Sequence, residues 1–147
     1  MRKQPKLSTP PAGSKRPGIE STPDVVRHEP MTWGLGLVDF DGEWSWRKLD
    51  PDDIERLHAE LVELEGETLH DLQRTAKVKE IPAQHMVREA QQRLDLLGLE
   101  EHDTLWELRL KGKRRTWGLM RGSVFCLLWW DPDETACHPP PKGNRRR

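Results

Sequence analysis

The chain has 147 residues, a charged fraction of 33% and a mean hydropathy of −0.86. No apolar run approaches the roughly 20 residues that a membrane helix needs, and no apolar stretch follows the basic N-terminus as a secretory signal requires. We therefore expect a soluble cytoplasmic protein whose two cysteines are reduced thiols. Cys137-His138 has no partner pair at metal-ligand spacing, so no zinc site or other cofactor is predicted.

The net charge of −1 conceals a segregation of charge along the chain. Residues 31–107 carry 8 basic and 19 acidic side chains, whereas residues 108–130 carry six basic side chains and no acidic one. This asymmetry favours an anionic partner for the basic stretch. An equally weighted alternative is that acidic helices and a basic sheet edge neutralise each other within the domain.

Both ends of the chain are predicted to be disordered. Residues 1–30 form a basic tail rich in Pro, Ser, Thr, Gly and Lys, which cannot bury enough apolar surface to offset the entropy of ordering. Residues 136–147 form a second tail, with a proline run and three terminal arginines. Between them, residues 31–135 are predicted to form a single α+β domain.

The first half of this domain is predicted to contain a hairpin and then helices. Residues 32–40 and 43–49 indicate two strands around an Asp-Gly turn. Asp50 as N-cap and Pro51 at the first helical position begin a helix that extends to about residue 65. The pattern then predicts a short helix at residues 68–74, a loop at 75–80, and a helix at 81–97 opened by Ile81-Pro82.

The second half is predicted to be a three-stranded meander over residues 105–132. Lys111-Gly112 and Arg121-Gly122 supply the two tight turns. The third strand, residues 124–130, is apolar throughout, so both of its faces should be covered and it is expected to be the central strand. A strand or hairpin, two to three helices and an antiparallel meander indicate an α+β fold with the helices on one face of the sheet.

This order of elements resembles the RelE/ParE-like toxin superfamily over roughly residues 44–132. Four segments are also similar to a family of small bacterial proteins: WSWRKLD (44–50), AQQRLDLLGL (90–99), LRLKGKRRTWGL (108–119) and SVFCLLWWDP (123–132). That family continues through a Trp-Asp-Pro-Asn-His type sequence. This chain has Glu134 at the position of the histidine, so a catalytic role of that histidine does not carry over.

The RelE-like resemblance implies ribosome-associated mRNA cleavage, and ParE-like relatives instead inhibit DNA gyrase. Both kinds of toxin are held in check by a cognate antitoxin. In the RelE-like reaction the ribose 2′-hydroxyl attacks the adjacent phosphodiester. One group must accept the hydroxyl proton, another must protonate the leaving oxygen, and cations must stabilise the phosphorane.

Several residues of this chain suit those tasks. Arg114, Arg115 and Arg121 are candidates for stabilising charge, because guanidinium groups bind phosphate oxygens bidentately. Glu107 or His138 could transfer protons, with His85 as a remote third candidate. The residues predicted to contact nucleic acid are Arg109, Lys111, Lys113, Arg114 and Arg115.

Two functional hypotheses follow from the sequence. The first is a toxin-like, RNA-directed protein of a bacterial toxin–antitoxin system, in its strongest form an mRNA endonuclease, with mRNA, the ribosome and an antitoxin as partners and no membrane contact. The second is a non-catalytic interaction domain that binds a protein partner. Plainer interpretations stay open beside both: residues 111–115 also suit a charged turn, and the tryptophans at strand periods suit a core.

Overall fold

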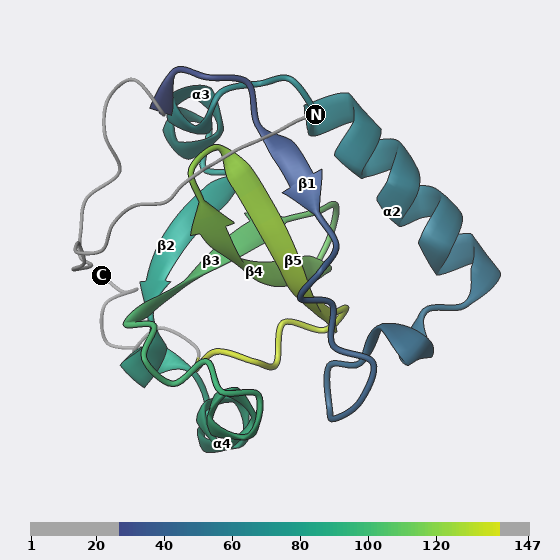
Figure 1. The fold of residues 1–147 in the computed structure, drawn as a ribbon. Coiled ribbons are helices and arrows are strands. Elements are labelled where there is room, and N and C mark those ends of the chain that lie inside the picture. Colours follow the sequence, from purple (N-terminus) through teal and green to yellow (C-terminus); the bar gives the residue numbers. More distant parts are fainter. Residues whose placement is uncertain (1–26, 139–147) are drawn as a thin grey trace, which may run out of the picture.

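The computed structural model describes residues 27–138, so the predicted tails at 1–26 and 139–147 lie outside the described residues. The described part combines three α-helices with a five-stranded mixed sheet in the order β1-β5-β4-β3-β2, which agrees with the predicted α+β class (Figure 1). The strands are β1 (Thr32–Gly34), β2 (Val78–Pro82), β3 (Thr104–Arg109), β4 (Arg115–Arg121) and β5 (Val124–Asp131). The helices are α2 (Pro51–Leu64), α3 (Leu69–Arg74) and α4 (Arg88–Leu96).

The predicted meander is present as β3, β4 and β5, which pair antiparallel in sequence order. Its two turns contain Gly112 at φ +70° and Gly122 at φ +59°, the left-handed conformations for which glycine is favoured. Strand β1 adds in parallel to β5, and β2 adds antiparallel to β3. The expectation that β5 is central is wrong, because β4 occupies the middle and β5 lies between β1 and β4.

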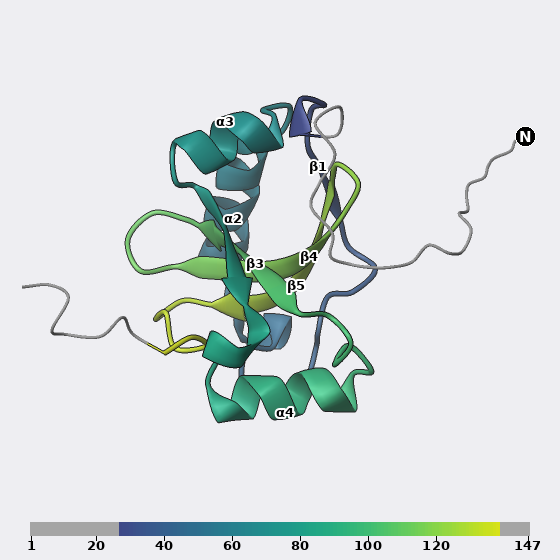
Figure 2. The ribbon, with the colours of Figure 1, turned by 90° about the vertical axis from the view of Figure 1, so that its left-hand side faces the viewer.

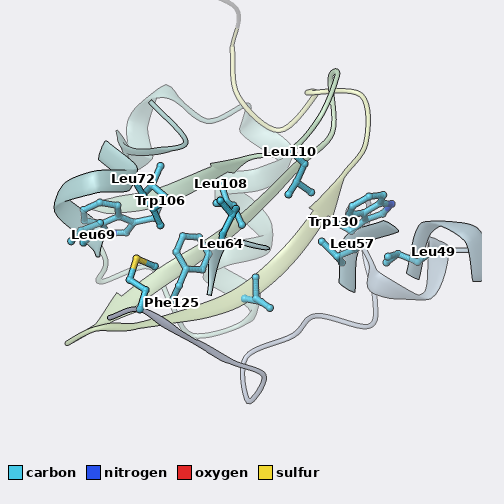
Figure 3. Packing of buried hydrophobic residues seen from close by; sticks show 13 residues of the cluster. Leu49, Leu57, Leu64, Leu69, Leu72, Trp106, Leu108, Leu110, Phe125 and Trp130 are labelled. Carbon is cyan, nitrogen blue, oxygen red and sulfur yellow. The ribbon is translucent and has the colours of Figure 1, made fainter. Parts of the chain in front are cut away.

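Helices cover both faces of the sheet, which corrects the prediction that they lie on one face. One apolar cluster joins α2 and α3 to side chains such as Trp106, Phe125 and Trp130 (Figure 3). A second cluster joins α4 to Trp117 and Trp129 on the opposite face. In both ribbon views α4 lies across the sheet from α3 (Figures 1 and 2). The meander is buried on both faces, as the unbroken apolar sequence of β5 predicts.

A β-bulge in β5 places two consecutive side chains on the same face of the sheet. Trp117 pairs with Trp129 and Gly118 pairs with Leu127, so Leu128 is an extra residue in β5. Leu128 and Trp129 consequently both pack in the α4 cluster, whereas Leu127 and Trp130 pack in the other. A Cβ at residue 118 would overlap the carbonyl oxygen of Cys126, so only glycine fits at the bulge.

Helix α2 begins as predicted. Asp50 accepts a hydrogen bond from the backbone of Asp53, the Asp53 side chain returns one to Asp50, and Pro51 opens the helix. Leu57 and Leu64 face the core, whereas Ile54, which shares their helical spacing, is exposed. Helix α2 therefore presents an apolar side chain to solvent on a flank that the sheet does not cover.

Three other predicted elements are wrong. Residues 43–49 do not form a strand but contain a 3₁₀ helix at Trp46–Lys48, capped by the Ser45 side chain. Residues 75–80 include most of β2 rather than a loop only. Pro82 ends β2 instead of opening a helix, and α4 begins later, at Arg88.

The described chain stays packed beyond residue 135, where the second tail was predicted to begin. Ala136 is buried in the α4 cluster and its carbonyl accepts a hydrogen bond from the Val87 amide. Cys137 forms a β-bridge with Met86, and the His138 amide donates to the carbonyl of His85. This segment therefore belongs to the folded part, since it closes the α4 face of the sheet.

Candidate nucleic-acid interface

A cleft of about 280 Å³ lies at the end of the sheet where β3 turns into β4. Its walls are α2, the turn from α3 into β2, and the hairpin between β3 and β4. The basic lining residues are Lys77, Arg109, Lys111 and Arg115, and the acidic ones are Glu60 and Glu63. We call this feature the basic cleft.

Glu60 of α2 fastens the hairpin to the helix. One carboxylate oxygen accepts from Arg114 Nη2 at 2.6 Å and the other accepts from the Lys111 amide at 2.9 Å. Glu60 and Arg114 are both mostly buried, so this charge-assisted pair is well shielded from water. The other terminal nitrogen of Arg114, Nη1, is buried and has no acceptor among residues 27–138.

Arg115 is more deeply placed, at 4% exposure. Its Nη1 donates to the carbonyls of Gly112 at 3.0 Å and Arg114 at 2.9 Å, so the guanidinium holds the hairpin turn together. Its Nη2 donates to Glu134 at 2.9 Å, and its Nε lies 3.4 Å from a carboxylate oxygen of Glu107. Arg115 thus links β4 to β3 and to the segment after β5.

The carboxylate of Glu107 lies beside Arg115, and its pKa departs from the ordinary value. It is 8% exposed, and burial raises its pKa above the ordinary value, although the positive charges of Arg115 and Arg109 oppose the rise. Burial also raises the pKa of the half-buried Cys137 thiol, helped by the negative charge of Glu107. The Cys137 Sγ lies 3.5 Å from the carbonyl oxygen of His85.

The predicted catalytic residues do not all converge. Arg114 and Arg115 are neighbours at the hairpin, and Glu107 joins Arg115. Arg121 lies at the far end of β4, about 20 Å from Arg115 along the strand. The His138 amide donates to the carbonyl of His85, which follows the end of β2 that pairs with Thr104, and His138 is exposed.

The predicted nucleic-acid contacts divide into two groups. Arg114 and Arg115 are held in ion pairs, whereas Arg109, Lys111 and Lys113 form no ion pair within 4.0 Å in the part of the chain that is described. Lys111 and Lys113 are exposed and Arg109 is half-buried. The exposed Lys77 joins them across the cleft, although sequence reasoning left it in a loop.

Two buried aspartates are structural residues that sequence reasoning missed. Asp131, at the end of β5, accepts bonds from Trp117 Nε1 and from the backbone amides of Thr135 and Ala136. Asp39 accepts two bonds from Arg93 and one from Trp129 Nε1. Both carboxylates bond the indole N–H of a buried tryptophan, a pairing that only the folded chain reveals.

No family model matches the chain, and comparison with curated proteins and with solved structures likewise found no match. Within residues 27–138, no group of three or more His, Cys, Asp and Glu side chains could hold a metal ion. No helix in that range is long and apolar enough to cross a membrane. The function must therefore be argued from the geometry of the cleft and its surroundings.

Proposed function

We propose that this protein is a toxin-like, RNA-directed protein, with a RelE/ParE-like arrangement of its elements, that contacts RNA through the rim of the basic cleft. The observation that carries the proposal is the set of cations without ion pairs at one end of the sheet. Lys77, Lys111 and Lys113 are exposed and Arg109 is half-exposed, so all four can reach a phosphate backbone.

Ion pairing separates these cations from the rest of the basic stretch. Glu60 neutralises Arg114, and Glu107 with Glu134 neutralises Arg115. Among the described residues, Glu63 is the one carboxylate of the cleft lining that forms no ion pair, against the four cations Lys77, Arg109, Lys111 and Lys113. The cations outnumber it, so the cleft keeps a positive potential. A polyanion that approaches this end of the sheet gains from several cations at once, which is the usual basis of RNA affinity.

The geometry supports RNA binding more strongly than RNA cleavage by the residues predicted from sequence. A catalytic group must touch the phosphodiester, whereas Arg115 and Glu107 are 4% and 8% exposed. Both terminal nitrogens of Arg115 already donate hydrogen bonds, Nη1 to two backbone carbonyls and Nη2 to Glu134. We therefore propose Arg114 and Arg115 as positioning residues that shape the hairpin, with the rim lysines as the RNA contacts.

The test is binding of a single-stranded RNA of about 20 nucleotides, measured by fluorescence anisotropy over a range of salt concentrations. The variant Lys111→Glu/Lys113→Glu should weaken binding about tenfold or more and reduce the salt dependence, by about 0.7 in slope per lost phosphate contact. Arg121→Glu is the matched control, since it reverses an exposed charge at the far end of the same meander. Equal loss in the control would refute a site at the cleft.

Expression in a bacterial host tests the toxin-like part of the proposal. Wild-type protein should arrest growth, and Lys111→Glu/Lys113→Glu should relieve the arrest while Arg121→Glu does not. Mapping mRNA 5′ ends in the same cultures separates the two modes of action: intact mRNA indicates inhibition by binding, and codon-phased new ends indicate cleavage. Normal growth with soluble wild-type protein and no antitoxin gene would contradict the toxin-like proposal.

A further inference from the structure

An apolar groove of about 330 Å³ lies between β1 and α2, lined by a different face of α2 from the one at the basic cleft. Leu57 and Leu127 contribute to its buried part, and Trp33 and Trp46 to its sides. The Trp33 indole N–H donates to the carbonyl of Leu61 at 3.0 Å, which holds β1 against the helix. Among residues 27–138, His58 and Glu65 are the polar residues that line the groove.

Exposed apolar side chains concentrate at this groove. Leu35, Ile54 and Val62 are 67%, 55% and 53% exposed, and all three line it. They are three of the five large hydrophobic residues that are exposed in the described chain. Single exposed apolar residues are ordinary on a protein surface, but a cluster around a concave site marks a surface that is covered by a partner.

The charge around the groove indicates what kind of partner fits. Residues 50–67, which include α2, contain eight acidic side chains and one arginine, and two of the acids, Glu60 and Glu63, line the basic cleft instead. On the groove side, the exposed Glu65 lines the groove, and the exposed Glu55 precedes the groove residue Val62 by two helical turns. A partner with aliphatic side chains for the groove and lysine or arginine on its flanks would satisfy both the apolar surface and the acidic rim.

The shape favours a helix as the occupant. Along the groove, α2 contributes Ile54, His58 and Leu61 at helical spacing, and its C-cap residue Glu65 continues the row, over about 16 Å or three turns. A second helix laid beside α2 can place apolar side chains at i, i+3 or i+4, and i+7 against such a stripe. A groove of this volume accommodates a few aliphatic anchors rather than a large folded surface.

We propose that the β1–α2 groove binds a basic amphipathic helix of a partner protein. The site is separate from the RNA contacts, since none of the described residues lines both the groove and the basic cleft. The inference therefore does not rest on the RNA proposal, and each can fail without the other.

The test uses the full chain and, as the probe, a synthetic amphipathic peptide of about 14 residues built from leucine and lysine. Binding is followed by NMR through the indole N–H signals, because Trp33 and Trp46 both line the groove. We expect these two signals to shift on titration. A peptide of the same pattern with glutamate in place of lysine should bind about tenfold more weakly or not at all.

Substitutions locate the binding. Leu35→Ser/Val62→Ser should weaken the leucine–lysine peptide about tenfold or more, since it removes two apolar anchors without touching the acidic rim. Leu96→Ser is the matched control: Leu96 is 78% exposed on α4, away from the groove, and its variant should bind like the wild type.

Three outcomes would overturn the proposal. The first is no shift of the Trp33 and Trp46 signals, and the second is equal weakening by both sets of substitutions. The third is that the groove is already occupied in the absence of peptide. In that case, Trp33 and Trp46 signals that shift with protein concentration would identify a second copy of the chain as the occupant. Signals from residues 1–26 that change in Leu35→Ser/Val62→Ser alone would identify the chain's own N-terminal segment.

Discussion

Replacing Asp39 by alanine should destabilise the protein by about 3 kcal/mol. The Asp39 carboxylate is buried and accepts from Arg93 Nε at 2.9 Å, Arg93 Nη2 at 2.8 Å and Trp129 Nε1 at 3.0 Å. It also accepts from the Asp41 amide at 3.0 Å. One side chain thus joins the loop after β1 to α4 and to β5.

The predicted loss of stability is the sum over the donors that lose the Asp39 carboxylate as acceptor. The Trp129 indole N–H becomes a buried donor without an acceptor, which costs about 1–3 kcal/mol. Arg93 is partly exposed and can turn to water, so the loss of its ion pair adds only about 1 kcal/mol. The Asp41 amide lies near the surface and adds about 0.5 kcal/mol or less.

Urea unfolding measures this change directly. With an m-value of about 2 kcal/mol per M, the midpoint should fall by about 1.5 M. Asp95→Ala is the matched control, because Asp95 is an exposed aspartate two residues from Arg93 on the same helix. A midpoint for Asp39→Ala within about 0.3 M of the control would refute the assigned role of the carboxylate.

The pH dependence provides an independent check. Burial raises the pKa of Asp39, but the bonds from Arg93, the Asp41 amide and Trp129 outweigh it, and the folded-state pKa lies below the ordinary value. The stabilisation is therefore complete above an unfolded-state pKa of about 3.9 and is lost as pH falls through the folded-state pKa. The difference between wild type and Asp39→Ala should be constant from about pH 7 to 5 and shrink below about pH 4. A difference that grows on acidification would contradict this account.

Two further predictions test the sheet. Gly118→Ala should lower the free energy of unfolding by about 3 kcal/mol, because the new Cβ would overlap the Cys126 carbonyl oxygen and lie 2.6 Å from the Phe125 ring. Thermal unfolding measures this loss. Gly36→Ala is the control and should show no such loss, since no described atom lies within 4 Å of a Cβ at that position. The Glu107 carboxyl should titrate above the ordinary glutamate pKa of about 4.3 in a carbon-13 NMR titration, so its contribution to stability decreases as pH rises through that midpoint. A Glu107 midpoint at or below the ordinary value of about 4.3 would show that the positive charges of Arg115 and Arg109 outweigh burial.

The parts of the fold that sequence predicted correctly depend on local signals. Gly112 and Gly122 form turns because their left-handed conformation is a property of the turn itself. Asp50 and Pro51 begin α2 because capping involves only residues within one helical turn. The alternation and apolar runs of β3 to β5 likewise record burial directly.

The errors arise where tertiary contacts decide the conformation. Trp44-Ser45-Trp46 alternates like a strand, but Ser45 caps a 3₁₀ turn and the Trp46 amide bonds to the carbonyl of Asp39. Strand β2 lies at the edge of the sheet with Lys79 and Glu80 exposed, so it lacks an apolar pattern, and its pairing with β3 makes it a strand.

In the candidate site, too, tertiary contacts decide what the sequence alone does not reveal. The basic stretch is visible in sequence, but which of its cations remain available is not. Glu60 and Glu134, the partners of Arg114 and Arg115, lie 54 and 19 residues away. Arg114 and Arg115 are neutralised within the domain, as one of the two interpretations of the charge segregation predicts. Binding of an anionic partner by Lys111 and Lys113 stays a prediction.

Helix α2 separates the two proposed binding surfaces, and this makes each a control for the other. Glu60, Glu63 and Leu64 line the basic cleft, whereas Ile54 and Val62 belong to the apolar groove. Binding energy at well-separated sites without shared partners is close to additive. Lys111→Glu/Lys113→Glu should therefore leave peptide affinity unchanged, and Leu35→Ser/Val62→Ser should leave RNA affinity unchanged. If a groove variant weakened RNA binding as much as a cleft variant, the two surfaces would not act as independent sites, and coupling through α2 would have to replace the separate assignments.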